Sequence, residues 1–203
     1  GSEAVSAVIA DPRVAAVTLT GSEGAGSQVA RAAGEHLKKS VLELGGSDPF
    51  IVMPRADIAK AVEIATRSRM VNNGQSCIAA KRFIVHERIA DDFEGRFVKA
   101  MAALKVGDPM DPATQVGPLA SRQLVDDLAE QVDESVARGA RILTGGRRIP
   151  GSGFFFEPTV LVDIPSGSPA YEDETFGPVA SVLRVRDVNE AVRIANDTRF
   201  GLG

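Results

Sequence analysis

Residues 14–46, VAAVTLTGSEGAGSQVARAAGEHLKKSVLELGG, are the stretch that decides the fold. Val14–Leu19 is a short apolar and β-branched run that ends at the turn Thr20-Gly21-Ser22, so it predicts a strand. Residues 28–39 have the spacing of an amphipathic helix, and Val41–Leu44 predicts a second strand. The order strand, helix, strand is that of a β-α-β unit, which needs further strands beside it to form a parallel sheet.

The remaining sequence continues this alternation of strands and helices. Strands are expected at residues 50–53, 82–86, 140–143, 154–156, 160–162 and 179–185. Helices are expected after the capping residue Asp57, at residues 90–104 and 121–138, and from about Val188. The succession predicts an α/β fold with a layered, mostly parallel sheet.

Composition excludes several classes of function. The chain has 203 residues, 44% of them apolar, which is enough for one substantial hydrophobic core. Its 27 acidic residues outnumber its 23 basic ones, so we expect no nucleic-acid partner. No apolar run approaches the roughly 18 residues of a membrane span and no signal region is apparent, so we expect a cytoplasmic protein without a membrane partner. One cysteine and two histidines offer no metal-ligand spacing.

Two glycine-punctuated turns carry the residues best suited to chemistry. Cys77, the one cysteine, ends the run Asn72-Asn73-Gly74-Gln75-Ser76-Cys77, and Glu43 precedes Gly45-Gly46. A thiolate is a strong nucleophile and a carboxylate can act as general base, so the pair suggests covalent catalysis on a carbonyl. The plain alternatives are a small core residue for Cys77 and a solvated surface charge for Glu43. A buried helix would not be interrupted by this loop, which favours the catalytic interpretation of Cys77.

Two further motifs are weak when taken alone. Gly21-Ser22 opens a helix, where backbone amides favour a phosphate, although serine is common at any helix start. Glu174-Thr175-Phe176-Gly177-Pro178 would by itself be an acidic loop with one core aromatic residue.

Together and in this order, the four motifs resemble the aldehyde dehydrogenase superfamily, and within it the branch that oxidises succinic semialdehyde. The resemblance implies NAD or NADP as cofactor and a small aldehyde as substrate, oxidised to the acid through a cysteine thioester. It also implies a role for each motif residue: Cys77 as nucleophile, Glu43 as general base, Gly21 and Ser22 at the cofactor pyrophosphate, Leu44 at the nicotinamide, Glu174 at the nicotinamide ribose and Phe176 beside the ring.

The resemblance further implies a division of the chain. Residues 1–44 are expected to be a remnant of a dinucleotide-binding domain, and residues 45–203 a catalytic domain truncated at its C-terminal end. The family's asparagine donor to the oxyanion lies upstream of residue 1, which leaves the Cys77 backbone amide as one donor. The fragment alone is therefore expected to be weak or inactive, and the full-length protein to be a homo-oligomer.

Some questions stay open at this level. Val71 stands where some succinate-semialdehyde enzymes have a carboxylate-binding arginine, and Ala79 where some have a second cysteine. The choice between NAD and NADP is not readable from this stretch. Two other functions remain: a thiol-dependent esterase or acyltransferase, which would need His36 or His86 beside Cys77, and a non-catalytic fragment that self-associates through exposed strand edges.

Overall fold

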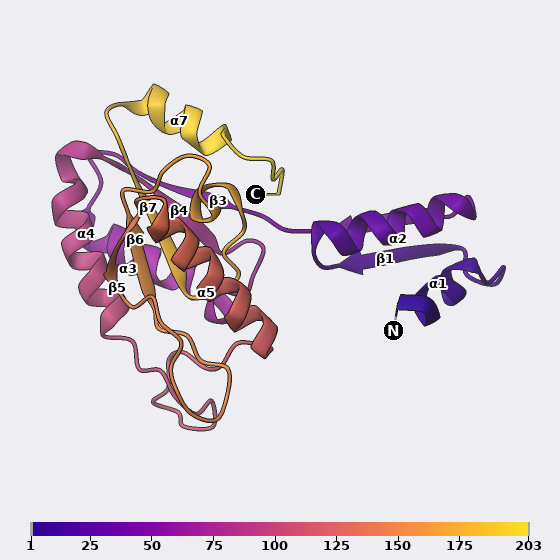
Figure 1. The fold of residues 1–203 in the computed structure, drawn as a ribbon. Helices are drawn as coiled ribbons and strands as arrows, with labels where there is room; N and C mark the ends of the chain where they lie inside the picture. The colour runs from indigo at the N-terminus through magenta and orange to yellow at the C-terminus, as the bar shows by residue number, and fades with distance from the viewer. Residues whose placement is uncertain (1, 203) are drawn as a thin grey trace. The chain divides into compact units, whose positions relative to one another are not determined.

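The computed structural model describes residues 2–202, with the side chain of Ser2 left out, and these residues divide into two compact units (Figure 1). The first unit extends to Gly46, and the second runs from Ser47 to Gly201. Each unit is described below by itself.

The first unit is a β-α-β unit preceded by a helix. Its elements are α1 (Ser2–Ala10), β1 (Ala16–Thr20), α2 (Glu23–Glu35) and β2 (Lys39–Glu43). Strands β1 and β2 are parallel, and α2 packs on both. The expected β-α-β unit is therefore present. Helix α2 begins earlier than the spacing suggested, because the Ser22 side chain accepts a hydrogen bond from the Ala25 amide and starts the helix there.

The second unit is built on a five-stranded sheet in the order β3-β4-β7-β6-β5. All neighbouring strands are parallel except β5, which runs antiparallel to β6 at one edge. This confirms the expected α/β fold with a mostly parallel sheet. The elements are β3 (Asp48–Val52), α3 (Ile58–Arg69), η1 (Val71–Gly74), β4 (Ala80–His86), α4 (Glu87–Ala102), α5 (Arg122–Ala137), β5 (Arg141–Thr144), β6 (Thr159–Val162), α6 (Pro169–Glu172), β7 (Val179–Val185) and α7 (Val188–Asn196).

Two hydrophobic clusters, one on each face of this sheet, hold the second unit together. On one face, the apolar stripes of α3 and α4 pack against alternate residues of the strands, and the Phe97 ring contacts those of Phe83 and Phe93. On the other face, α5 and α7 pack against the intervening residues, including Ile84 and Leu183. Because successive strand residues point to opposite faces, central strands covered on both sides are apolar almost throughout.

One expected strand is absent from the structure. Residues 154–156 form no strand, since only an isolated bridge joins Phe156 to Arg148. Phe156 is buried in the core although it belongs to a loop. A short apolar run of this kind has the same sequence pattern as a buried strand. His86, at the end of β4, is buried. Its Nδ1 atom accepts a hydrogen bond from the Arg88 amide at the start of α4.

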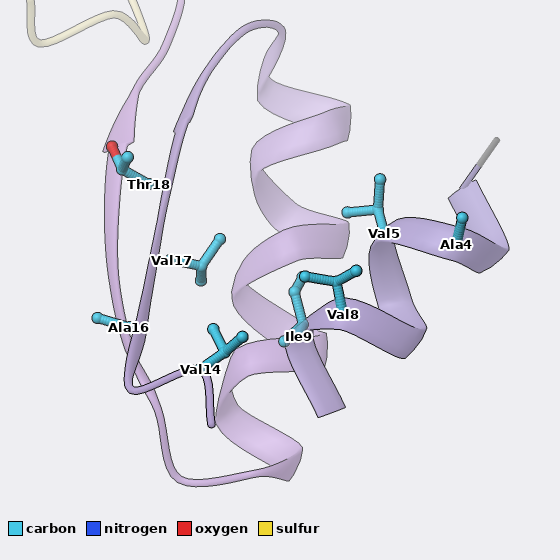
Figure 2. Close-up of a pocket in the computed structure, with 8 residues that line it drawn as sticks. All are labelled: Ala4, Val5, Val8, Ile9, Val14, Ala16, Val17 and Thr18. Carbon is cyan, nitrogen blue, oxygen red and sulfur yellow. The ribbon is translucent and has the colours of Figure 1, made fainter. Parts of the chain in front are cut away.

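The first unit contains an apolar pocket between α1 and β1 (Figure 2), which none of the predicted site residues lines. Its walls include Val5, Val8, Ile9, Val14 and Val17. Within the part of the chain that the structure describes, no helix is long and apolar enough to cross a membrane.

Candidate active site

The loop before Cys77 has an unusual backbone. Asn72, Asn73 and Gly74 all have positive φ angles, of 49°, 57° and 80° respectively. This left-handed region is disfavoured for residues with a Cβ atom, and asparagine and glycine are the residues that tolerate it best. Three such residues in succession turn the chain sharply out of α3 and lead it to Cys77, which is half-buried.

Side-chain hydrogen bonds fix this loop. Asn73 bridges to the neighbouring segment, accepting from the Gly117 amide at 3.1 Å and donating to the Pro118 carbonyl at 3.4 Å. The Gln75 Oε1 atom accepts from the Ala120 amide at 2.8 Å, while its Nε2 atom donates to the Asn72 carbonyl. The two amide side chains therefore hold the nucleophile loop against residues 117–120, which offsets the strain of its backbone.

Gly74 has no room for a side chain. A Cβ atom at this position would lie 2.1 Å from the Gly177 carbonyl oxygen and 2.9 Å from the Arg69 Nη2 atom. The loop that carries Cys77 and the segment that carries Glu174 consequently touch backbone to backbone. The Gly74 carbonyl in turn accepts a hydrogen bond from Arg69 Nη2 at 2.6 Å.

Sheet topology explains why the Cys77 and Glu174 segments meet. Cys77 precedes β4 and Glu174 precedes β7, and these strands are parallel neighbours with Arg82 opposite Ser181. The segments that lead into two adjacent parallel strands lie at the same end of the sheet. This is the end at which the strands begin, whereas ligands of open α/β sheets generally bind at the carboxyl ends of the strands.

Lys81 joins the two segments. Its side chain is 2% exposed, and its Nζ atom lies within hydrogen-bonding distance of the carbonyl oxygens of Ser76, Cys77 and Ala79, at 3.1, 3.0 and 3.2 Å. The same Nζ atom pairs with Glu174 Oε1 at 3.2 Å. Burial lowers the pKa of Lys81, and the positive charge of Arg69 lowers it further, while Glu174 opposes both effects.

Arg69 is a second buried cation in this region. Its side chain has no exposure, and burial lowers its pKa to about 9 although the charge of Glu174 acts in the opposite direction. Apart from Nη2, its guanidinium nitrogens have no hydrogen-bond partner among the described residues. Two cations thus lie near one carboxylate, beneath the loop that presents the thiol.

The first unit carries the other predicted residues. Gly21 and Ser22 are exposed at the start of α2, and the Gly21 amide donates to the Glu43 carbonyl at 2.9 Å. Glu43 is exposed at the end of β2. Leu44 packs on Gly26, where a Cβ atom would lie 2.6 Å from the leucine side chain, so the glycine lets α2 approach this residue closely.

The predicted residues thus fall into two groups. The structure brings Cys77 and Glu174 together in the second unit, with Phe176 half-buried in the same segment as Glu174. It places Gly21, Ser22, Glu43 and Leu44 in the first unit. Sequence reasoning missed the roles of Lys81, Arg69, Asn73 and Gln75. Only the paired asparagines gave a signal, since asparagine tolerates left-handed backbone. Among the described residues, no cluster of side chains is suited to a metal ion.

Comparison with known proteins defines the class. The model of the aldehyde dehydrogenase family matches residues 1–203, and the chain belongs to this family. It is 58% identical over its whole length to the succinate-semialdehyde dehydrogenase [NADP(+)] of Mycobacterium avium, and 57% identical to that of Mycobacterium ulcerans. The chain spans 43% and 44% of the length of these two relatives.

Solved structures agree with this assignment. The succinic semialdehyde dehydrogenase of Streptococcus pyogenes, solved in complex with NADP+, is 41% identical with a TM-score of 0.95, over 100% of this chain and 44% of that one. The lactaldehyde dehydrogenase of Escherichia coli is 36% identical with a TM-score of 0.92, over 96% of this chain and 41% of that one. The fold is therefore shared among relatives whose names give different substrates.

Proposed function

We propose that this chain carries the catalytic residues of an NADP-dependent aldehyde dehydrogenase that oxidises succinic semialdehyde to the acid, with Cys77 as nucleophile and Glu43 as general base. One observation carries most of the weight: the only cysteine ends a strained, hydrogen-bonded loop that is tied through Lys81 to Glu174. A half-buried thiol held in this way is suited to nucleophilic attack.

The residues present fit a dinucleotide. The exposed start of α2 at Gly21 and Ser22 offers backbone amides and the positive end of the helix dipole for a pyrophosphate. The Glu174 side chain keeps 18% of its surface exposed while paired with Lys81, so its carboxylate can accept hydrogen bonds from ribose hydroxyls. Leu44 would meet the nicotinamide end through its backbone, and Phe176 would supply apolar surface beside the ring. When bound, the cofactor supplies the hydride acceptor.

The chain's own groups supply the remaining chemistry. The Cys77 sulfur, as thiolate, bonds to the aldehyde carbon, and the Cys77 amide donates to the oxyanion that forms. Once that carbon has been oxidised, Glu43 removes a proton from a water molecule that attacks the thioester. The acid leaves, and the Cys77 thiol is restored.

One of the two histidines is already engaged, which weighs against a cofactor-free thiol esterase. An esterase would use a histidine to activate Cys77. The Nδ1 atom of His86 is occupied as the cap of α4. Succinic semialdehyde is proposed as substrate because the two mycobacterial relatives are named for it. Position 71 is valine and cannot bind the distal carboxylate of succinic semialdehyde, so another residue must bind it.

The test measures NADPH formation from succinic semialdehyde and NADP+ by the protein as the cell makes it, so that any sequence beyond these 203 residues is present. We expect steady turnover in the wild type and none in Cys77→Ser. We expect the 203-residue chain alone to turn over weakly. Ester cleavage that needs Cys77 but is indifferent to NADP+, with no NADPH formed, would reject the dehydrogenase in favour of a thiol esterase.

A further inference from the structure

We infer that Lys81 is a positioning residue: its buried ammonium group holds the Cys77 loop and the Glu174 carboxylate in one fixed arrangement, so that cofactor binding and the placement of the nucleophile depend on the same side chain. This inference deepens the proposed function and rests on it.

The acceptors around Lys81 come from two segments of the chain. An ammonium group has three hydrogens, and four acceptors lie within 3.2 Å of this one: the carbonyls of Ser76, Cys77 and Ala79 and the Glu174 carboxylate. Three of them belong to the turn that presents the thiol and the fourth to a segment about a hundred residues later in the chain. One side chain therefore joins the turn that presents the thiol to a carboxylate that is distant in the sequence.

The Lys81–Glu174 ion pair carries a cost that an apolar pair would avoid. Buried ion pairs cost desolvation energy, and replacing them by apolar residues of similar size is often neutral or stabilising. The region already holds Arg69, whose positive charge disfavours a second cation beside it. An apolar pair at positions 81 and 174 would fill the same space without this cost. The retained ammonium is better explained by the orientation that it imposes on Glu174 and on the Cys77 loop.

The Cys77 loop and the Glu174 segment also have contacts that do not involve Lys81. The Gly74 backbone lies against the Gly177 carbonyl, and Gln131 donates to the Glu174 carbonyl at 3.2 Å. The Glu174 backbone is thus fixed independently of Lys81. What the lysine adds is the direction of the carboxylate, which is the part of Glu174 that would meet ribose hydroxyls.

The experiment compares Lys81→Met with the wild type in the assay described above. Losing the cation removes the charge-assisted contact that directs the Glu174 carboxylate, so we expect the KM for NADP+ to rise roughly ten- to hundredfold, the range that a charge-assisted hydrogen bond is worth. We expect Lys81→Arg, which keeps the charge, to stay within about threefold of the wild-type KM. Glu174→Gln should raise the KM similarly, and adding Lys81→Met to it should have little further effect.

A matched control lies one residue along the strand. Arg82 is also a buried cation, and its guanidinium donates to the backbone carbonyls of Ser47, Ile194 and Ala195 rather than to those of the Cys77 loop. We expect Arg82→Met to lower the melting temperature while leaving the KM for NADP+ unchanged in the folded protein. This separates loss of positioning from general destabilisation.

The outcomes are distinct. An active wild type with an unchanged KM for NADP+ in folded Lys81→Met overturns the inference alone. If Lys81→Met does not fold, Lys81→Arg decides: a rise of tenfold or more in its KM, in a folded protein, also overturns it, whereas a KM near that of the wild type supports it. A wild type that forms no NADPH removes the proposed function and this inference with it.

Discussion

At the scale of single residues, the nucleophile loop depends on backbone conformations that few side chains allow. Asn72, Asn73 and Gly74 turn the chain through the left-handed region, and Gly74 also leaves space for the Gly177 carbonyl. Hydrogen bonds of Asn73 and Gln75 with residues 117–120 keep the backbone in this strained conformation. Strained backbone that persists under such constraint is typical of functional sites.

Replacement of Gly74 by alanine tests this description. The new Cβ atom would lie 2.1 Å from a backbone oxygen, so the chain would have to shift. The φ angle of +80° at this position is also unfavourable for alanine. We expect Gly74→Ala to lower the free energy of unfolding by about 2 kcal/mol or more, measured by urea denaturation.

Gly95 provides the matched control for that substitution. It lies within α4, and a Cβ atom there would meet nothing within 4 Å. We expect Gly95→Ala to raise the free energy of unfolding by about 0.5–1 kcal/mol, because alanine is the better helix former. If both alanine variants behaved alike, the packing described around Gly74 would be wrong.

At the scale of elements, several helices begin where the sequence supplies a capping side chain. Asp57, Ser121 and Asp187 accept hydrogen bonds from the first-turn amides of α3, α5 and α7. These starts were predicted from sequence at Asp57 and Ser121, because capping is a local property. The order of the strands was not predictable, since pairing between β4 and β7 is decided by packing of residues far apart in the chain.

Helix α7 gives a pH-dependent prediction. Glu190 accepts hydrogen bonds from the Arg186 side chain and amide, which lower its pKa to about 2 from an ordinary value of 4.5. The folded state therefore binds this proton less tightly than the unfolded state. The stabilising contribution is complete above pH 4.5 and is lost as the pH falls through 2.

We expect Glu190→Gln to remove that part of the pH dependence. Urea midpoints measured from pH 6 down to pH 3 should fall less steeply in Glu190→Gln than in the wild type. Glu63→Gln, on the exposed surface of α3, serves as the control and should follow the wild type. A Glu190→Gln profile parallel to that of the wild type would contradict the assigned ion pair.

The aromatic cluster beneath α4 tests the packing of the sheet. Phe97 is fully buried and its ring lies 4.9 Å from that of Phe83 and 5.3 Å from that of Phe93, between centroids. We expect Phe97→Ala to cost about 3–5 kcal/mol in unfolding free energy, because it removes buried apolar surface and leaves a cavity. A loss below about 1 kcal/mol would mean that the ring is not part of a close-packed core.

At the scale of the whole molecule, sequence and structure agree on class and differ in detail. The alternation of apolar periodicities predicted an α/β protein with a mostly parallel sheet, which the structure has. The motifs around Cys77 and Glu174 were visible in sequence, but Lys81 was only one cation among several. Its role appears once β4 and β7 are neighbours, because strand pairing brings Glu174 to it. The same limit applied to residues 154–156, whose apolar run resembles a strand although only Phe156 is buried.

The central claim is that Cys77 and Glu43 act in sequence on one substrate. Rapid mixing of Glu43→Gln with succinic semialdehyde and NADP+ tests it most directly, in the protein as the cell makes it. Without the general base, the thioester should form but hydrolyse slowly. We predict a burst of about one NADPH per Cys77 and, by mass spectrometry, a succinyl group on the peptide that contains Cys77. Continuous wild-type turnover in Glu43→Gln, or a burst with Cys77 unmodified, would contradict the claim.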